Sequence, residues 1–165
     1  MRAITLILPD VRSAYNVGAV MRTANATGAS VWTCGYSPHP AVPGDTRPPY
    51  RADRATRLIQ KTALGSEEHV NHRHFPTLTD ATTQARSLGL RIIALEQAAS
   101  AQNVFEYHYA ADIALVVGSE VTGLDKASLE MCDDVIELPM HGMKESLNVS
   151  VAAGIALYAL RYSRP

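Results

Sequence analysis

Two short, almost continuous apolar segments restrict the possible folds of this chain more than any other feature of its sequence. They are residues 91–95 (RIIAL) and 112–117 (DIALVV). Runs without alternation are typical of strands that are buried on both faces, and such strands belong to parallel sheets with helices packed on either side. The two segments therefore predict an α/β domain with a largely parallel sheet.

The rest of the chain alternates between strand-like and helix-like patterns. Residues 35–50 hold five prolines and two glycines, which predicts a long loop without regular structure. Because no repeat, low-complexity tract or linker divides the series, we expect one domain over residues 1–165. We predict strands at residues 3–8, 30–34 and 135–138; helices at 53–64, 125–131 and 147–162; a helix from a cap at Asn16 to Gly28; and a short helix from a cap at Thr79 or Asp80 to Gly89.

The cysteines and the apolar runs indicate where the protein resides. Cys34 and Cys132 are far apart and lie outside any Cys-x-x-Cys motif, so we expect buried free thiols in a reducing compartment. The apolar run at residues 3–8 is too short for a signal peptide. The later run at 151–160 is about half of the roughly 20 residues that a membrane span needs. We therefore expect a cytoplasmic protein.

The sequence argues against a metal site and against a general attraction to nucleic acid. His69, His72 and His74 lie in one segment, but no further pair of cysteines or histidines completes a recognisable ligand set, so no metal is expected. The 15 Lys and Arg residues are balanced by 16 Asp and Glu residues, a net charge of −1. Any binding of nucleic acid must come from a local basic patch.

Three segments hold the polar residues that are most suited to a site. They are residues 16–25 (NVGAVMRTAN), 117–124 (VGSEVTGL) and 136–150 (IELPMHGMKESLNVS). In the first, Asn16 and Arg22 lie roughly 9 Å apart along the axis of the predicted helix. The other two are loops that follow strands, where open α/β sheets place their ligand sites. Together the three segments outline a pocket.

In this order, and over essentially the whole chain, the three motifs resemble those of the SpoU (TrmH-like) branch of the SPOUT superfamily of S-adenosylmethionine-dependent RNA methyltransferases. The resemblance implies a SPOUT fold, in which the C-terminal part of the sheet is threaded into a deep trefoil knot, an exception to the usual absence of knots. It also implies a bent S-adenosylmethionine in a cleft at the knot. The implied reaction is methyl transfer to a ribose 2′-hydroxyl, with S-adenosylhomocysteine as product and tRNA as the expected substrate.

Carried over to this sequence, the family pattern assigns a set of cofactor-binding residues. The leucines and the methionine of this set would supply apolar walls and main-chain amides, or belong simply to the core. The glycine would let the backbone approach the cofactor, or only end a strand. The serine and asparagine would hydrogen-bond the methionine moiety, although the serine could instead cap the last helix. The set is Leu95, Glu96, Gly118, Leu138, Met140, Ser146, Leu147 and Asn148.

The resemblance also implies the catalytic residues, which are Asn16 and Arg22. A guanidinium keeps its proton up to about pH 12, so Arg22 is an awkward general base. It could instead stabilise negative charge that develops on the attacking oxygen, or hold the adjacent phosphate. Glu120 is expected to support the active site by bracing Asn16 or the knot loops.

A basic segment and an apolar last helix indicate the partners. The cations at residues 47–61 are a candidate RNA-binding patch, with Tyr50 as a stacking ring, or else the solvated face of a helix. The last helix is apolar on most sides, so it is either buried within its own domain or the seam of a homodimer. The five cations of the patch are Arg47, Arg51, Arg54, Arg57 and Lys61.

Because the first predicted strand begins at residue 3, we expect a methyltransferase domain without a separate RNA-binding domain. Two other functions stay open at this point. One is an RNA-binding module that keeps the knot without turnover. The other is a methyltransferase that acts on a substrate other than RNA, which the near-neutral charge would suit.

Overall fold

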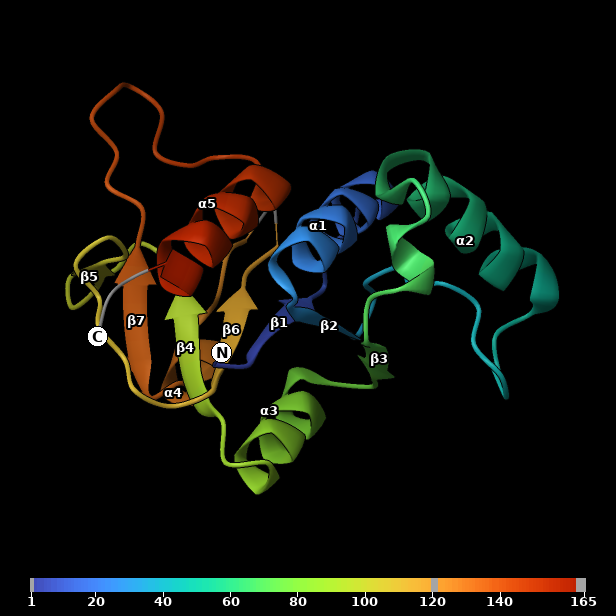
Figure 1. Ribbon diagram of the computed structural model, residues 1–165, viewed down its shortest axis with the longest axis horizontal. Helices are drawn as coiled ribbons and strands as arrows, with labels where there is room; N and C mark the ends of the chain where they lie inside the picture. The colour runs from blue at the N-terminus through green and yellow to red at the C-terminus, as the bar shows by residue number, and fades with distance from the viewer. Residues whose placement is uncertain (1, 120–121, 163–165) are drawn as a thin grey trace.

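The computed structural model of the protein describes residues 2–119 and 122–162. Within these residues the strands form one parallel sheet of seven, in the order β3-β2-β1-β6-β4-β7-β5 (Figure 1). The predicted fold class, a parallel sheet flanked by helices, is confirmed. The elements are β1 (Ile4–Pro9), α1 (Ala14–Thr27), β2 (Ser30–Cys34), α2 (Pro49–Ala63), a 3-10 turn (Ser66–Glu68), β3 (His72–Phe75), α3 (Leu78–Ser87), β4 (Arg91–Leu95), β5 (Gln102–Asn103), β6 (Ile113–Val117), α4 (Lys126–Glu130), β7 (Asp134–Glu137) and α5 (Val149–Tyr162).

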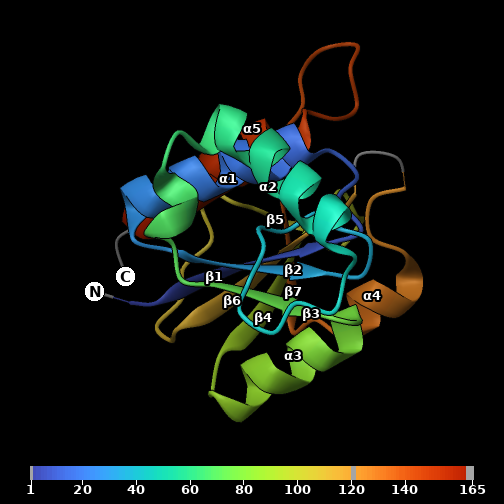
Figure 2. The same ribbon diagram turned by 90° about the vertical axis from the view of Figure 1, so that its right-hand side faces the viewer.

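Helices cover both faces of the sheet. Helices α1, α2 and α5 lie over one face, and α3 and α4 lie over the other (Figure 2). Leu6 and Leu8 of β1 belong to the hydrophobic cluster beneath α1 and α5, whereas Ile7 between them belongs to the cluster beneath α3. Because successive side chains of a strand point to opposite faces, a strand covered on both sides must be apolar at every position. This explains the continuous apolar runs in β4 and β6.

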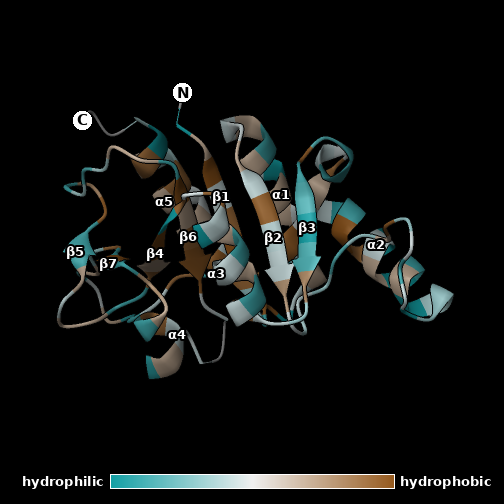
Figure 3. Ribbon diagram, turned by 90° about the horizontal axis from the view of Figure 1, so that it is seen from below, coloured by the Kyte–Doolittle hydropathy of each residue, from teal (hydrophilic) through white to brown (hydrophobic). Residues whose placement is uncertain are grey.

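The edges of the sheet are more polar than its centre. In Figure 3 the edge strands β3 and β5 are hydrophilic in colour, whereas β1 and β6 at the centre are hydrophobic. Strand β7 pairs between β4 and β5, although it comes after both in the chain. The segment from β4 to β6 therefore passes around β7. The trefoil knot that the family resemblance implies stays a prediction.

The predicted caps of two helices are wrong by a few residues. Helix α1 is capped by Ser13, whose side chain accepts a hydrogen bond from the backbone N–H of Asn16 at 3.3 Å. Asn16 therefore lies inside the first turn. Helix α3 is capped by Thr77, which accepts from the backbone N–H of Asp80 at 3.1 Å. In both cases the hydroxyl one turn earlier satisfies an N–H group that lacks a partner within the helix.

Two other helices begin at different residues from those predicted. Helix α2 begins at Pro49, earlier than residue 53, because proline fits the first turn, where its missing N–H costs nothing. Helix α5 begins at Val149, later than residue 147. Asn148 precedes it and accepts from the backbone N–H of Ser150 at 2.9 Å. The helix is therefore capped by Asn148 and not by Ser146.

Both cysteines are free thiols, as predicted, but only Cys34 is buried, whereas Cys132 is partly exposed. Burial raises the pKa of Cys34 to about 12 and that of Cys132 to about 11, so neither thiol ionises near neutral pH. Over the described ranges, every helix falls short of the length and apolar character that crossing a bilayer requires.

Candidate active site

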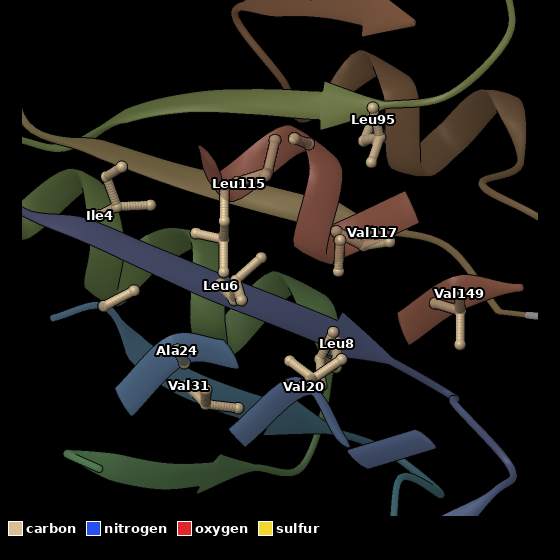
Figure 4. Packing of buried hydrophobic residues seen from close by; sticks show 14 of the residues in the cluster. Ile4, Leu6, Leu8, Val20, Ala24, Val31, Leu95, Leu115, Val117 and Val149 are labelled. Carbon is tan, nitrogen blue, oxygen red and sulfur yellow. The ribbon is translucent and has the colours of Figure 1, made fainter. Parts of the chain in front are cut away.

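A cleft opens at the carboxyl ends of β4, β6 and β7 and encloses about 270 Å³. Its wall is continuous with the core, because Leu95, Val117 and Val149 line the cleft and also belong to the main cluster of buried side chains (Figure 4). The residues that the family pattern assigns to the cofactor meet here with one exception. Those that line the cleft are Leu95, Glu96, Gly118, Leu138, Met140, Ser146 and Leu147.

The exception is Asn148, which joins the cleft to the first motif. Its side-chain N–H donates to Oδ1 of Asn16 at 3.2 Å, across 132 positions of sequence. Its own Oδ1 accepts from the backbone N–H of Ser150 at 2.9 Å and from the hydroxyl of Ser150 at 2.7 Å. The amide of Asn148 is thus oriented by the start of α5 and turned toward α1. Asn16 therefore lies beside Leu147 and Val149, the two neighbours of Asn148 that line the cleft.

Two glycines after β6 have structural reasons. The backbone N–H of Gly123 donates to the carbonyl of Ser119 at 3.1 Å, which brings these two residues together. A Cβ at Gly118 would lie 2.5 Å from the carbonyl carbon of Gly123. The close approach of its own loop is thus one reason for a glycine at position 118, and the approach of the backbone to a cofactor stays a prediction.

Arg22 lies away from the cleft. Its exposed side chain lines a separate groove together with Lys61 and Thr62 of α2 and Tyr158 of α5. The structure therefore brings Asn16 to the cleft within a single chain, and it leaves Arg22 on a different face of α1. The catalytic role of Arg22 stays a prediction.

Sequence reasoning missed two acidic residues that line the cleft, and one residue that it predicted falls outside the described part of the chain. Glu137 at the end of β7 and Glu145 in the following loop line the cleft, so with Glu96 the described residues of its lining include three carboxylates. Their positions at or after the end of a strand were the available signal. Glu120, the expected support for the active site, lies outside the described residues.

Helix α2 carries most of the predicted RNA-binding cations on its exposed surface. Arg47 differs, because its guanidinium is used within the loop before α2. It forms an ion pair with Asp45 at 2.5 Å and donates to the carbonyls of His39 and Pro40 at 3.1 and 3.2 Å. Arg47 therefore holds the loop together. The cations that do point into solvent are Arg51, Arg54, Arg57 and Lys61.

The histidine-rich segment forms a structural cluster. His72 and His74 of β3 face Thr33 of β2, whose hydroxyl lies 3.1 Å from Nε2 of His72 and 3.0 Å from Nδ1 of His74. His39 stacks on His74 with 3.9 Å between ring centroids. Within residues 2–119 and 122–162, no group of three or more His, Cys, Asp or Glu side chains is arranged to hold a metal ion.

A parallel sheet with a cleft of this kind at its carboxyl edge defines a ligand-binding α/β domain, and comparisons with known proteins identify its family. The model of the SpoU rRNA Methylase family matches residues 46–158. The chain therefore belongs to the SpoU methylase family, as the three motifs predicted.

Individual relatives agree with this assignment. The chain is 34% identical over 163 residues to the 23S rRNA (guanosine-2′-O-)-methyltransferase RlmB of Coxiella burnetii, covering 98% of this chain and 59% of that protein. It is 30% identical over 161 residues to the tRNA (guanosine(18)-2′-O)-methyltransferase of Escherichia coli strain K12, covering 98% and 64%. Among solved structures, the TrmH/SpoU tRNA modifying enzyme of A. aeolicus superposes with a TM-score of 0.78 and 25% identity, covering 98% of this chain and 75% of that one. The chain thus spans about three fifths of the length of the two curated relatives.

Proposed function

We propose that this protein transfers a methyl group from S-adenosylmethionine to a ribose 2′-hydroxyl of RNA, with tRNA as the first substrate to test and the cytoplasm as the compartment. One observation carries the proposal. Segments from three distant parts of the sequence meet at one cleft, where Asn148 of the third motif holds Asn16 of the first at 3.2 Å. The two curated relatives named above are guanosine 2′-O-methyltransferases of RNA, which supports the same reaction here.

The lining of the cleft fits the proposed methyl donor. Leu95, Leu138 and Leu147 offer apolar surface to an adenine ring, and backbone groups at the strand ends offer hydrogen bonds. The carboxylates of Glu96, Glu137 and Glu145 suit a ligand that carries a sulfonium and an ammonium group. When bound, the sulfonium supplies an activated methyl group, so the protein has mainly to align the attacking oxygen and assist loss of its proton.

The residues of the chain divide this work between them. The hydrogen bond from Asn148 fixes the amide of Asn16 at the edge of the cleft, where it can orient a substrate hydroxyl. Arg22, a permanent cation, would stabilise charge that develops on the sugar oxygen or hold the adjacent phosphate. The exposed cations of α2 would bind the RNA backbone near α1, against which α2 packs.

We further propose that the protein acts as a homodimer. Helix α5 buries one face in the core, yet it exposes Val151, Tyr158 and Tyr162 on the other, next to exposed Phe105. Tyr158 also borders the groove of Arg22, so a second copy that covers this face would lie against Arg22. The buried face agrees with a helix packed within its own domain, and the exposed apolar face supports the proposed dimer. Sedimentation velocity is expected to show a dimer that Tyr158→Glu dissociates, whereas Tyr36→Glu, on an exposed loop residue, leaves it intact.

The activity is tested by incubating the protein with isotopically labelled S-adenosylmethionine and bulk tRNA. We expect label in an alkali-resistant dinucleotide, the product that a 2′-O-methyl group leaves. Arg22→Ala should lower the rate about 100-fold or more, as loss of one stabilising donor does elsewhere. Lys126→Ala, on the opposite layer of the domain, is the matched control and should keep the wild-type rate.

Two results would favour the other functions. RNA binding without transfer of label would indicate a binding module. Full activity after charge reversal at both Arg51 and Arg54 would indicate a substrate other than RNA.

A further inference from the structure

Glu96 is the cleft residue whose side chain is held most completely. It follows β4 directly, and its backbone N–H donates to the carbonyl of Ile136 in β7 at 3.0 Å. Its Oε1 accepts from the backbone N–H of Gln97 at 3.0 Å, and its Oε2 accepts from the backbone N–H of Leu124 at 2.7 Å. The carboxylate thus joins the end of β4 to the loop after β6, and both of its oxygens are fixed by main-chain donors.

Gly123 restricts the movement of this carboxylate on one side. A Cβ at position 123 would lie 2.4 Å from Oε2 of Glu96, and the φ of Gly123 is +63°, in the left-handed region that favours glycine. The loop backbone is therefore packed directly against the carboxylate. Glu96 therefore cannot swing toward the loop, and it lines the cleft.

The carboxylate oxygens of Glu96 indicate which kind of ligand group the cleft would bind there. Each carboxylate oxygen has two lone pairs, and the backbone uses one on each oxygen, so two acceptor sites remain. A pair of vicinal hydroxyls is the donor arrangement that matches two adjacent acceptors. Acidic residues near the ends of parallel strands accept from ribose hydroxyls in dinucleotide-binding sheets.

We propose that Glu96 recognises the ribose hydroxyls of the adenosyl group, and that it selects ribose over deoxyribose ligands. This inference rests on the proposed function. Of the three carboxylates in the cleft, Glu96 is chosen because the described hydrogen bonds hold both of its oxygens in place before any ligand binds. Preorganised acceptors discriminate strongly, because an analogue without the hydroxyl leaves them unpaired.

Calorimetric titration with S-adenosylhomocysteine and with its 2′-deoxy and 3′-deoxy analogues tests this proposal. We expect the wild-type protein to bind S-adenosylhomocysteine roughly tenfold or more tightly than at least one of the deoxy analogues. Glu96→Gln should reduce that ratio to about threefold or less, by weakening S-adenosylhomocysteine and sparing the analogue. Glu137→Gln removes one charge from the same cleft and should keep the wild-type ratio.

The ratio of affinities separates recognition from a bracing role. If Glu96→Gln weakens all three ligands equally, Glu96 only braces the loop after β6 and the proposal is wrong. Should that variant fail to fold, Gly123→Ala perturbs the same carboxylate from the other side and must lower the ratio; an unchanged ratio overturns the proposal. A wild-type protein that binds S-adenosylhomocysteine without discrimination overturns this inference alone, whereas one that binds no S-adenosylhomocysteine overturns the proposed function as well.

Discussion

Gly18 is the residue that lets helices α1 and α2 approach each other. A Cβ at this position would lie 2.3 Å from both the carbonyl oxygen of Ile59 and Oγ1 of Thr62. Thr62 in turn donates to the carbonyl of Tyr15 at 2.8 Å, so the contact holds the start of α1 to the end of α2. The first helical motif therefore contains a packing residue between its two predicted catalytic residues.

Gly18→Ala should destabilise the protein although alanine favours helices by up to about 1 kcal/mol. The new methyl group collides with backbone, which cannot rotate away, and overpacking of this kind costs about 1–3 kcal/mol. We expect a lower free energy of unfolding in urea. Gly142→Ala, where a Cβ meets nothing within 4 Å, should change it by less than about 0.5 kcal/mol. An unaltered stability for Gly18→Ala would mean that the two helices can separate freely.

At the scale of single residues, the sequence predicted the positions of the cleft residues better than that of Arg22. Leu95 ends one apolar strand and Gly118 follows another, so their place at the carboxyl edge of the sheet follows from the strands alone. Arg22 is on a helix, and the side of α1 that it occupies depends on how α1 packs between α2 and α5. That packing is a tertiary property that spacing along the chain does not contain.

At the scale of elements, the histidine cluster ties the loop before α2 to the sheet. Burial lowers the pKa of His39 and of His72 to about 4, and the neighbouring His74 and Arg47 add to the effect. Burial and Arg47 also lower the pKa of His74. The loop is thus anchored by histidines that are neutral in the folded state.

The pH dependence of stability follows from these pKa values. The unfolded histidines titrate near pH 6.5, whereas His39 and His72 of the folded protein titrate near pH 4, so between these values the unfolded chain binds more protons and stability rises with pH. We expect the free energy of unfolding to fall by a few kcal/mol, on the order of 1.4 kcal/mol per pKa unit, as the pH drops from 6.5 to 4.5.

Urea titrations at several pH values measure this slope. His72→Gln should flatten it, whereas His69→Gln, on an exposed residue outside the cluster, should leave it unchanged. A wild-type slope in His72→Gln would show that the cluster does not govern acid stability.

The elements that sequence reasoning missed are the polar ones. Strand β3 (HRHF) has no apolar alternation because it is an edge strand whose histidines face Thr33 and His39 instead of a hydrophobic layer. Strand β5 has two residues and exists only through its pairing with β7. Strands β2 and β4, which are buried over nearly all their length, were predicted with their observed bounds. A strand that is buried on both faces has a continuous apolar run in its sequence, whereas a strand that is held only by backbone pairing at a sheet edge has no such pattern.

At the scale of the whole molecule, the protein has a net charge of −1, yet its proposed substrate, RNA, is a polyanion. Figure 1 shows α2 at one end of the molecule, projecting beyond the sheet. The exposed cations Arg51, Arg54, Arg57 and Lys61 lie along it. Cations on other elements are paired with carboxylates: Arg86 with Asp133 at 2.9 Å, Arg91 with Asp134, and Lys126 with Glu130 at 3.8 Å. The exposed cations of α2 therefore form a local concentration of positive charge that RNA would meet.

The concentration of cations on α2 predicts how RNA binding responds to salt. Each phosphate contact contributes about 0.7 to the slope of log affinity against log salt for a single strand. The double variant Arg54→Ala and Arg57→Ala should therefore lower the slope by about 1.4 and weaken binding similarly for RNAs of different sequence, because phosphate contacts carry no sequence information. Fluorescence anisotropy with tRNA over a range of salt concentrations measures both quantities, with Lys126→Ala as the control. A slope that stays at the wild-type value would mean that the RNA binds to a surface other than α2.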